Sequence, residues 1–401
     1  MRLEPACVVV CPTQAILVGD LNDPSSYVAQ IVNREPVAVR RPEKETLPKL
    51  FYKGAHQATL DPLAARRPDG GLFMWSEQQL SNEQVVSGNP NYNNSSAAAL
   101  LSYDVAHSIP WDWRVSLYTW TKGIASGVYL VAALMVLFGF LSPVNGTWLW
   151  TTPIVSGVFL ALTGGLLIWD LEHPERFHLI FTRPQWRSWL VKGAFIIAGY
   201  TLVLATHFIA SLAGSTTLQK WLMMAGIPLS ILTAVYTAYL FAQAKARDMW
   251  QNPLLPPHLF VQAILLGSAV LELSVVVLRG LTTSDDLMSA VLDTVRLEVV
   301  YLNWLVATFS LVHLLMVWGE VSLTHPTAHA RVAIWEMMRG RYRSDFWFGT
   351  ILSLLGGLLA WLAIVGVISF TAGVAGAPLA LVGLVLYENA YVQAGQSVPL
   401  A

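Results

Sequence analysis

The amino-acid sequence predicts an all-α integral membrane protein with eight transmembrane helices and a small N-terminal tail. Composition provides the first support for this fold class. Hydrophobic residues make up 55% of the 401 residues, whereas charged residues make up only 12%. That charged share is about half of the roughly 25% found in soluble domains. The net charge of −1 offers no basis for binding nucleic acid.

The lengths of the apolar runs provide the second support. Each run is close to the length of about 20 residues with which an α-helix crosses a hydrocarbon core of roughly 30 Å. Trp and Tyr gather at the run ends, as in interfacial belts. Eight crossings place both termini on one side, which we call the N-side. The predicted spans are Ser116–Leu141, Trp148–Trp169, Trp189–Ala213, Trp221–Ala242, Leu259–Leu278, Val299–Val321, Phe346–Phe370 and Val374–Ala390.

Basic residues are concentrated in the N-side loops. The positive-inside rule therefore predicts that the N-side faces the cytoplasm and that the protein lies in the cytoplasmic membrane. The alternative is that these residues serve a quinone site or a docked subunit. No secretory signal is expected in Met1–Asp20. The N-side loops hold Arg176, Arg183, Arg187, Lys245, Arg247, Arg331, Arg339, Arg341 and Arg343, and the far-side loops hold Lys220, Arg279 and Arg296.

The N-terminal tail, residues 1–60, carries a cysteine pair. Cys7 and Cys11 form a C-x3-C-P motif, the second half of the run that binds [4Fe–4S] clusters. Two thiolates cannot hold such a cluster alone. Either a partner completes it, or the chain starts late, or the tail is a vestigial docking piece; the structural alternative is a pair of buried or free thiols. Residues 61–110, rich in Asn, Ser, Gln, Gly and Pro, are predicted to be a linker; packing along a partner subunit is the alternative.

Ionisable and phenolic side chains near the N-side ends of the spans predict the functional site. A charge within a span costs about 2.5–3.5 kcal/mol on insertion scales, so each such residue needs a reason. Lys, His and Tyr can donate hydrogen bonds to quinone carbonyls, and Asp and Glu can relay protons. We expect the groups to converge in one quinone pocket. The band comprises Lys122, Asp170, Lys192, Tyr236, His313 and Glu320, beside the charged loop Trp169–Phe177 with His173 and Arg176.

Each of these residues also has a structural interpretation. Lys122 can extend to the surface, and Tyr236 can serve packing or the interfacial belt. His313 can bond a carbonyl on a neighbouring helix, and Asp170 can pair with Arg176 or Lys192. The shared depth of six groups favours the functional interpretation.

His207 and Glu272 lie at a second depth, each about 9 Å from the far-side end of its span at a rise of 1.5 Å per residue. They are either a proton relay toward the far side or a structural hydrogen-bonded pair. No pair of histidines in the spans is spaced to bind haem, so the membrane part, residues 111–401, is expected to hold no metal of its own.

Several segments resemble a known family. Leu117–Gly127, Trp169–Phe177, Arg183–Gly193, Tyr236–Leu240, Trp250–Phe260 and Ala394–Leu400 are similar to the NrfD/PsrC family, the membrane subunits of polysulfide reductase-type complexes. The Lys122 segment looks closest to the alternative complex III branch. The segments Cys11–Pro24 and Val39–Gly54 resemble the tail of ferredoxin-like subunits of molybdopterin oxidoreductases.

The resemblance implies two four-helix bundles, a ferredoxin-like iron–sulfur partner subunit and a molybdopterin-type catalytic subunit. It assigns quinone chemistry to Asp170 and Tyr236, with Lys122 and His173 as further choices. The expected function is electron transfer between an iron–sulfur chain and menaquinone or ubiquinone, with possible proton translocation. A structural anchor without quinone chemistry is the alternative. A secondary transporter is disfavoured because paired Gly/Pro breaks near the midplane are lacking.

Overall fold

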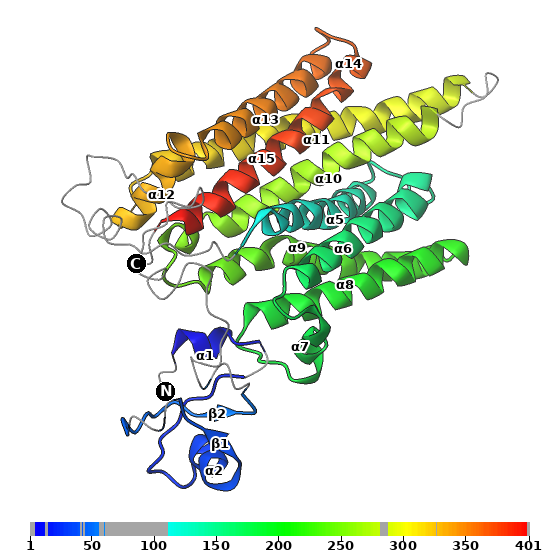
Figure 1. The fold of residues 1–401 in the computed structure, drawn as a ribbon. Coiled ribbons are helices and arrows are strands. Elements are labelled where there is room, and N and C mark those ends of the chain that lie inside the picture. The colour runs from blue at the N-terminus through cyan, green and yellow to red at the C-terminus, as the bar shows by residue number, and fades with distance from the viewer. Residues whose placement is uncertain are drawn as a thin grey trace.

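The computed structural model describes residues 5–12, 15–40, 42, 45–55, 60, 111–280, 288–325 and 327–398. The predicted linker, residues 61–110, lies outside the described residues. The described part combines a small N-terminal region with eight helices that are long and apolar enough to cross a membrane (Figure 1). The predicted fold class is therefore confirmed.

The elements follow one another in a simple order. The N-terminal region has α1 (Ala6–Val10), α2 (Tyr27–Arg34) and the antiparallel strands β1 (Val37–Ala38) and β2 (Tyr52–Lys53). The long helices are α5 (Trp113–Leu137), α6 (Thr152–Trp169, continuing a π-helical turn over Thr147–Thr151), α8 (Trp189–Leu212), α9 (Thr216–Ala242), α10 (Leu255–Gly280), α11 (Met288–Ser322), α13 (Arg343–Ile364) and α15 (Gly376–Ser397). Short helices α7 (Leu179–Thr182), α12 (Ala328–Met338) and α14 (Phe370–Val374) lie between them.

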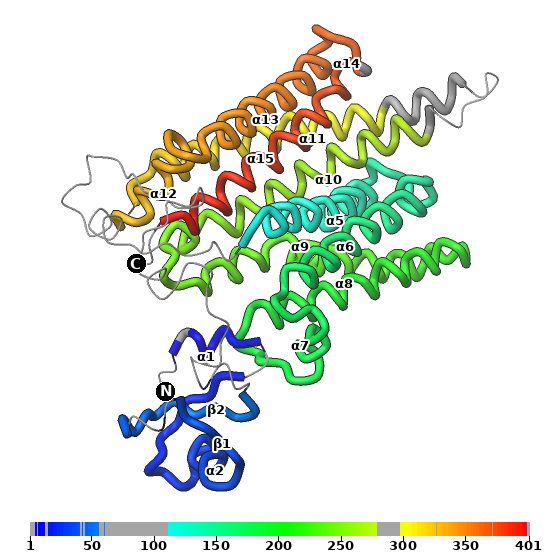
Figure 2. Tube along the Cα trace, viewed as in Figure 1, coloured from blue at the N-terminus to red at the C-terminus, as the bar shows by residue number. Residues whose placement is uncertain are grey.

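The long helices pack as two groups of four. Helices α5, α6, α8 and α9 form the first bundle, and α10, α11, α13 and α15 form the second (Figure 2). Helices α5 and α10 join the bundles at the centre, which explains why 18 of the 25 residues of α5 are buried.

The crossing of α5 and α10 depends on two glycines. A Cβ added at Gly127 would collide with the Ala263 carbonyl, and one added at Gly267 would collide with the Gly127 backbone. Close backbone approach at small residues is the usual way in which helices associate inside a membrane.

We expect Gly127→Val to lower thermal stability strongly, because its side chain would push α5 away from α10. Overpacking costs about 1–3 kcal/mol, and more where backbone must move. The measurement is the apparent Tm in detergent, with size-exclusion chromatography. Gly157→Val is the control, since no described atom outside its own helix lies within 4 Å of a Cβ added there. Equal losses in both variants would contradict the tight crossing.

The C-terminal ends of three long helices differ from the predicted ones by four residues or more. Helix α5 ends at Leu137 and α13 at Ile364, and each is closely followed by a glycine with positive φ: Gly139 at 78° and Gly366 at 78°. Glycine in this conformation commonly terminates helices. Helix α15 continues to Ser397, past the predicted end at residue 390, because its polar C-terminal residues are buried.

The N-side end of the molecule collects segments that are distant in the sequence. The Trp111 backbone N–H donates to Gln396 Oε1 at 3.1 Å. The Gln185 backbone N–H donates to the Pro12 carbonyl at 3.1 Å. The start of α5, the end of α15 and the cysteine-bearing tail therefore share one end of the helix array, with α1 near α7 (Figure 1).

Candidate functional site

Asp170 ends α6 at the N-side and is held there by the start of α5. The Arg114 guanidinium lies 3.7 Å from Asp170 Oδ1 and donates to the Trp169 carbonyl at 2.8 Å. It also donates to Asp112, at 2.9 Å. Asp112 caps α5 by accepting the Arg114 backbone N–H at 2.8 Å, as N-cap aspartates do. Arg114 is thus the partner of Asp170.

Burial dominates the electrostatics of Asp170. Loss of solvent raises the pKa of Asp170 to about 6, although Arg114 lowers it and Asp112 raises it further. The Asp170 side chain remains 17% exposed. A surface carboxyl with this pKa can gain or lose a proton near neutral pH, which suits proton transfer.

Lys122 is buried in α5 and bonded to α9. Its Nζ donates to the Ala234 carbonyl at 2.8 Å and to Thr237 Oγ1 at 2.7 Å, and lies 5.1 Å from the Tyr236 ring centre. Lys122 is only 1% exposed, so its ammonium does not extend to the surface. The Tyr236 ring packs on Gly193 of α8, where any Cβ would collide with it. Lys122 and Tyr236 therefore form one unit across three helices.

An apolar cavity of about 230 Å³ adjoins this unit. Its walls come from α6, the segment 171–181 that contains α7, and α8. Tyr236 is the single hydrogen-bonding side chain among the described lining residues, and Leu171, the neighbour of Asp170, forms part of the wall. The cavity thus brings an apolar surface to Tyr236 beside the Asp170 segment.

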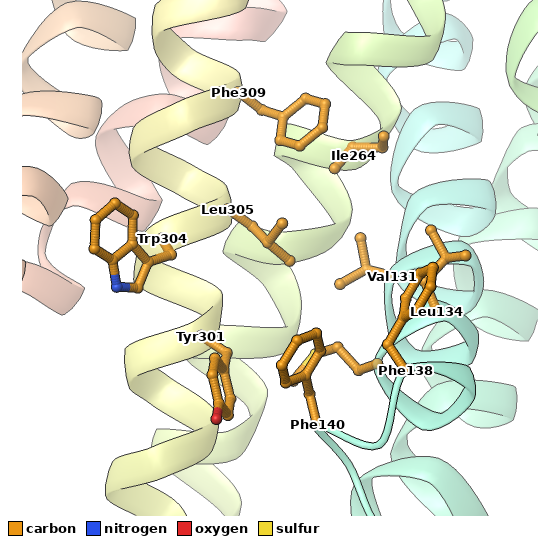
Figure 3. A pocket seen from close by; sticks show the side chains of 10 residues that line it. Val131, Leu134, Phe138, Phe140, Ile264, Tyr301, Trp304, Leu305 and Phe309 are labelled. Atoms are coloured by element: carbon orange, nitrogen blue, oxygen red, sulfur yellow. The ribbon is translucent and has the colours of Figure 1, made fainter.

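A second cavity of about 320 Å³ lies between the bundles (Figure 3). Tyr301, Leu305 and Phe309 line it from α11, and Val131 and Leu134 line it from α5 across the cavity, with Ile264 of α10 beside them. None of its described lining residues is Asp, Glu, His, Lys or Arg. It therefore lacks the acid–base groups found around Tyr236, and we do not assign the chemistry to it.

His313 and Glu320 belong to a separate buried cluster in the second bundle. His258 Nδ1 lies 3.0 Å from Glu320 Oε1, and His258 Nε2 lies 2.8 Å from His313 Nδ1. Tyr387 of α15 donates to Glu320 Oε2 at 2.5 Å. All four side chains are at most 1% exposed. Among the described contacts, none joins this cluster to Asp170, so the predicted band divides in two.

Glu388 of α15 lies between the clusters. Thr119 donates to Glu388 Oε2 at 2.6 Å, and the Glu388 carboxyl interacts electrostatically with Lys122. A void of about 20 Å³ is lined by Thr119 and Glu388 together with His258 and Tyr387. A void of this size has room for one water molecule. Glu388 is therefore the shared neighbour of both clusters.

Three predicted residues lie at the N-side surface. His173 Nδ1 is 3.3 Å and Arg176 Nε is 3.8 Å from the same Glu175 carboxylate oxygen. Lys192 Nζ lies 4.4 Å from the Trp189 ring centre. None of the three lines the 230 Å³ cavity.

His207 and Glu272 are not hydrogen-bonded to each other. His207 Nδ1 lies 3.4 Å from Tyr129 Oη, and its ring packs against Trp148 at 4.5 Å between centres. Both Glu272 carboxyl oxygens are fully buried and have no hydrogen-bond partner among the described residues. Their equal depth therefore does not correspond to a direct contact.

Sequence reasoning did not select four residues that the structure brings into these clusters: Arg114, His258, Tyr387 and Glu388. Glu388 lies inside the predicted eighth span, so the rule for ionisable groups in spans would have found it. Arg114 and His258 stand just before predicted spans, outside the reach of that rule. Tyr387 carries no signal beyond its position next to Glu388.

Known proteins resemble both parts of the chain. The family model described as "Polysulphide reductase, NrfD" matches residues 102–399. Protein NrfD of Escherichia coli (strain K12) is 27% identical over 187 residues, 41% of this chain and 58% of that protein. The arsenate respiratory reductase iron–sulfur subunit ArrB of Shewanella sp. (strain ANA-3) is 44% identical over 50 residues, 12% of this chain and 21% of that subunit.

A similar short match, 45% identity over 49 residues, relates the chain to the NrfC homolog of Haemophilus influenzae, covering 12% of this chain and 22% of that protein. These short matches concern the N-terminal region. The chain spans less than two thirds of each of these relatives. The family match, in contrast, extends over well more than half of the chain and includes all eight long helices. The chain therefore belongs to the NrfD polysulphide reductase family of multi-pass membrane proteins, as its sequence predicted.

Proposed function

We propose that this chain is the quinone-reactive membrane subunit of an oxidoreductase complex and exchanges electrons between an iron–sulfur chain and the quinone pool. The cavity that meets Tyr236, with the Lys122 ammonium behind the ring, supports this proposal. Apolar cavities with a few convergent polar groups are the usual form of small-molecule sites. Apolar walls suit the isoprenoid tail and ring of menaquinone or ubiquinone.

Each polar side chain near the cavity has a proposed role in the proton chemistry. Each turnover adds two electrons and two protons to a quinone or removes them from a quinol. Tyr236 is proposed to hydrogen-bond a quinone oxygen. Lys122 is proposed to hold the Tyr236 ring in place and to supply positive charge beside it. Asp170 is proposed to exchange protons with the aqueous N-side, because its pKa of about 6 allows both states. His173 is a further proton donor at that surface.

The surface charges beside the Asp170 segment have a different proposed role. Lys192 and Arg176 would attract a docked subunit or an anionic reduced headgroup. His313 and Glu320 both contact His258 in the buried cluster of the second bundle. We therefore do not assign them to headgroup binding.

Electrons would arrive through the N-terminal tail. Cys11 Sγ accepts the Ala15 backbone N–H at 3.1 Å, the kind of hydrogen bond that tunes cluster sulfurs. A [4Fe–4S] cluster fits here only in part, since Cys7 and Cys11 supply two of its four thiolates. Within the described residues, no group of three or more potential metal ligands occurs. The remaining ligands would come from another segment or subunit.

The proposed partner subunits dock at this same end of the molecule. The relatives of the tail include iron–sulfur subunits by name, and the Pro12–Gln185 hydrogen bond holds this tail beside the α7–α8 loop. We propose that a ferredoxin-like subunit docks there, served by a molybdopterin-type catalytic subunit. The described N-terminal tail and the end of α15 lie on this side, which we propose is cytoplasmic from its loop charge.

A photoreactive quinone analogue tests the proposal. We expect it to label peptides from α7 and α8 in the full chain, and Ala194→Trp, which fills the cavity, to reduce labelling at least tenfold. Leu202→Trp is the matched control on α8, because Leu202 is 68% exposed and outside this cavity. Absence of competable labelling in the unmodified protein would leave a structural anchor as the function.

A further inference from the structure

The second bundle contains a line of buried polar groups that the quinone site does not use. Helices α10 and α11 pack together (Figure 2), and the 2.8 Å contact between His258 and His313 fixes their register. The helices run antiparallel. Moving along α10 from His258 therefore means moving backwards along α11 from His313.

Polar residues recur on the facing side of each helix. On α10, His258, Gln262 and Glu272 are separated by four and ten residues, which places them on one face at 3.6 residues per turn. On α11, Glu320, His313, Ser310 and Asn303 follow at intervals of seven, three and seven, which also gives one face. All seven are at most 3% exposed. At 1.5 Å per residue, the line from Glu320 to the level of Glu272 covers about 30 Å, the thickness of the hydrocarbon core. We call this line the α10–α11 seam.

The seam is rich in polar atoms whose hydrogen bonds the described protein does not supply. They are His313 Nε2, Ser310 Oγ, Gln262 Oε1, Asn303 Oδ1 and both carboxyl oxygens of Glu272. Buried polar atoms in native proteins are bonded to protein or to ordered water, and an unmet bond costs about 1–3 kcal/mol. Water molecules are the partners that satisfy such a row of donors and acceptors.

Small residues let neighbouring helices pack closely against the seam. Gly357 of α13 faces Ser310, and a Cβ there would collide with it. Gly373 of α14 faces Asn303, where an added Cβ would lie 3.2 Å from Asn303 Oδ1. The 20 Å³ void beside His258 and Gln262 has room for a water molecule at the N-side end.

We infer that the α10–α11 seam is a water-lined proton path across the second bundle, from Glu320 at the N-side to Glu272 near the far side. His258 is bonded at both ring nitrogens, to Glu320 and to His313. It can therefore receive a proton at one nitrogen and release another from the opposite one. One proton is taken up at one end for each proton released at the other, and no electron moves.

The path continues to the far side through Glu298. This residue, next to the level of Glu272 on α11, accepts from Asn145 at 2.5 Å and from Thr147 at 3.2 Å. Asn145 lies in the far-side loop, and Thr147 begins the π-helical turn that leads into α6. In this proposal, Glu272 passes protons along α10 and α11 and not to His207.

Blocking the seam at its middle tests the inference. Asn303→Leu replaces the amide with an apolar side chain of similar size, and Glu272→Gln is a second variant should the first fail to fold. The complex purified from its native host is reconstituted in vesicles, and the number of protons translocated per electron is measured. We expect this ratio to fall at least twofold. The matched control, Thr308→Leu, lies on the exposed side of α11 and should keep the ratio.

Coupling to quinone turnover rests on the proposed function, whereas hydration of the seam does not. Radiolytic hydroxyl labelling of the full chain in nanodiscs therefore provides an independent measurement. We expect Tyr387, in the seam cluster, to be labelled at least tenfold faster than Tyr200, an equally buried tyrosine bonded to Ala125 at 2.7 Å. Equal labelling of the two tyrosines, or an unchanged ratio in both seam variants, would overturn the inference. Quinone inactivity with fast Tyr387 labelling would instead refute only the proposed function.

Discussion

Asp170→Asn is expected to lower quinone-coupled turnover at least about 100-fold while the protein stays assembled. The amide has the size of the carboxyl group but cannot carry a proton, and positioned acid–base groups contribute about 10²–10⁴-fold. Because Leu171 and the cavity wall are unchanged, the affinity for a quinone analogue should change less than about threefold. Steady-state turnover of the purified complex and analogue binding by fluorescence quenching give the two values.

Glu172→Gln is the control for this prediction, since Glu172 is exposed and two residues from Asp170. It should keep turnover within about twofold. Turnover in Asp170→Asn above a third of the wild-type rate would contradict the assignment of Asp170 as the proton-exchanging group.

The pH dependence adds a test of the same residue. A group with a pKa of about 6 gives a limb near pH 6. Activity rises with pH through this limb if Asp170 must accept protons from a quinol, and falls if it must donate them to a quinone. Arg114 lowers the pKa of Asp170, so Arg114→Gln should move the limb to higher pH in either case. A limb that stays in place would show that another group titrates.

The helices and their order follow from the sequence because the membrane imposes a minimum apolar length on each span. The depth of a polar group also follows, since each residue adds a rise of 1.5 Å to its helix. Lys122, Tyr236 and Asp170 were selected by this reasoning, and their assignment to one quinone site stays a prediction. In the structure, Lys122 lies 5.1 Å from the Tyr236 ring centre, and the cavity is lined by Tyr236 and by Leu171, the neighbour of Asp170.

Depth does not determine which way a side chain faces or which helices touch. His313 has a depth similar to that of Lys122, yet it faces α10 in the second bundle. His207 and Glu272 also match in depth. However, α8 packs on α6 and α9, whereas α10 packs on α5 and α11. The direction around each helix depends on tertiary packing, including the glycine crossing of α5 and α10, which one sequence does not specify.

Lys122→Met is expected to cause a large loss of stability. Methionine keeps the unbranched shape of lysine, so the change removes the charge and its hydrogen bonds to Ala234 and Thr237 but little packing. Each buried acceptor left without its partner costs about 1–3 kcal/mol, and a buried carboxylate that loses a nearby positive charge adds to this loss. Here that carboxylate is Glu388, which interacts electrostatically with Lys122 through space rather than through a direct ion pair.

The double variant Lys122→Met/Glu388→Gln distinguishes this cause from lost hydrogen bonds alone. If the uncompensated carboxylate is the main penalty, neutralising Glu388 should recover more than half of the lost Tm, and a double-mutant cycle should show strong coupling. Lys192→Met is the control, because that ammonium lies over the Trp189 ring at the surface and should cost less than about 1 kcal/mol. A double variant no more stable than Lys122→Met would mean that Glu388 does not depend on Lys122. In that case, the link between the two clusters through Glu388 would be lost.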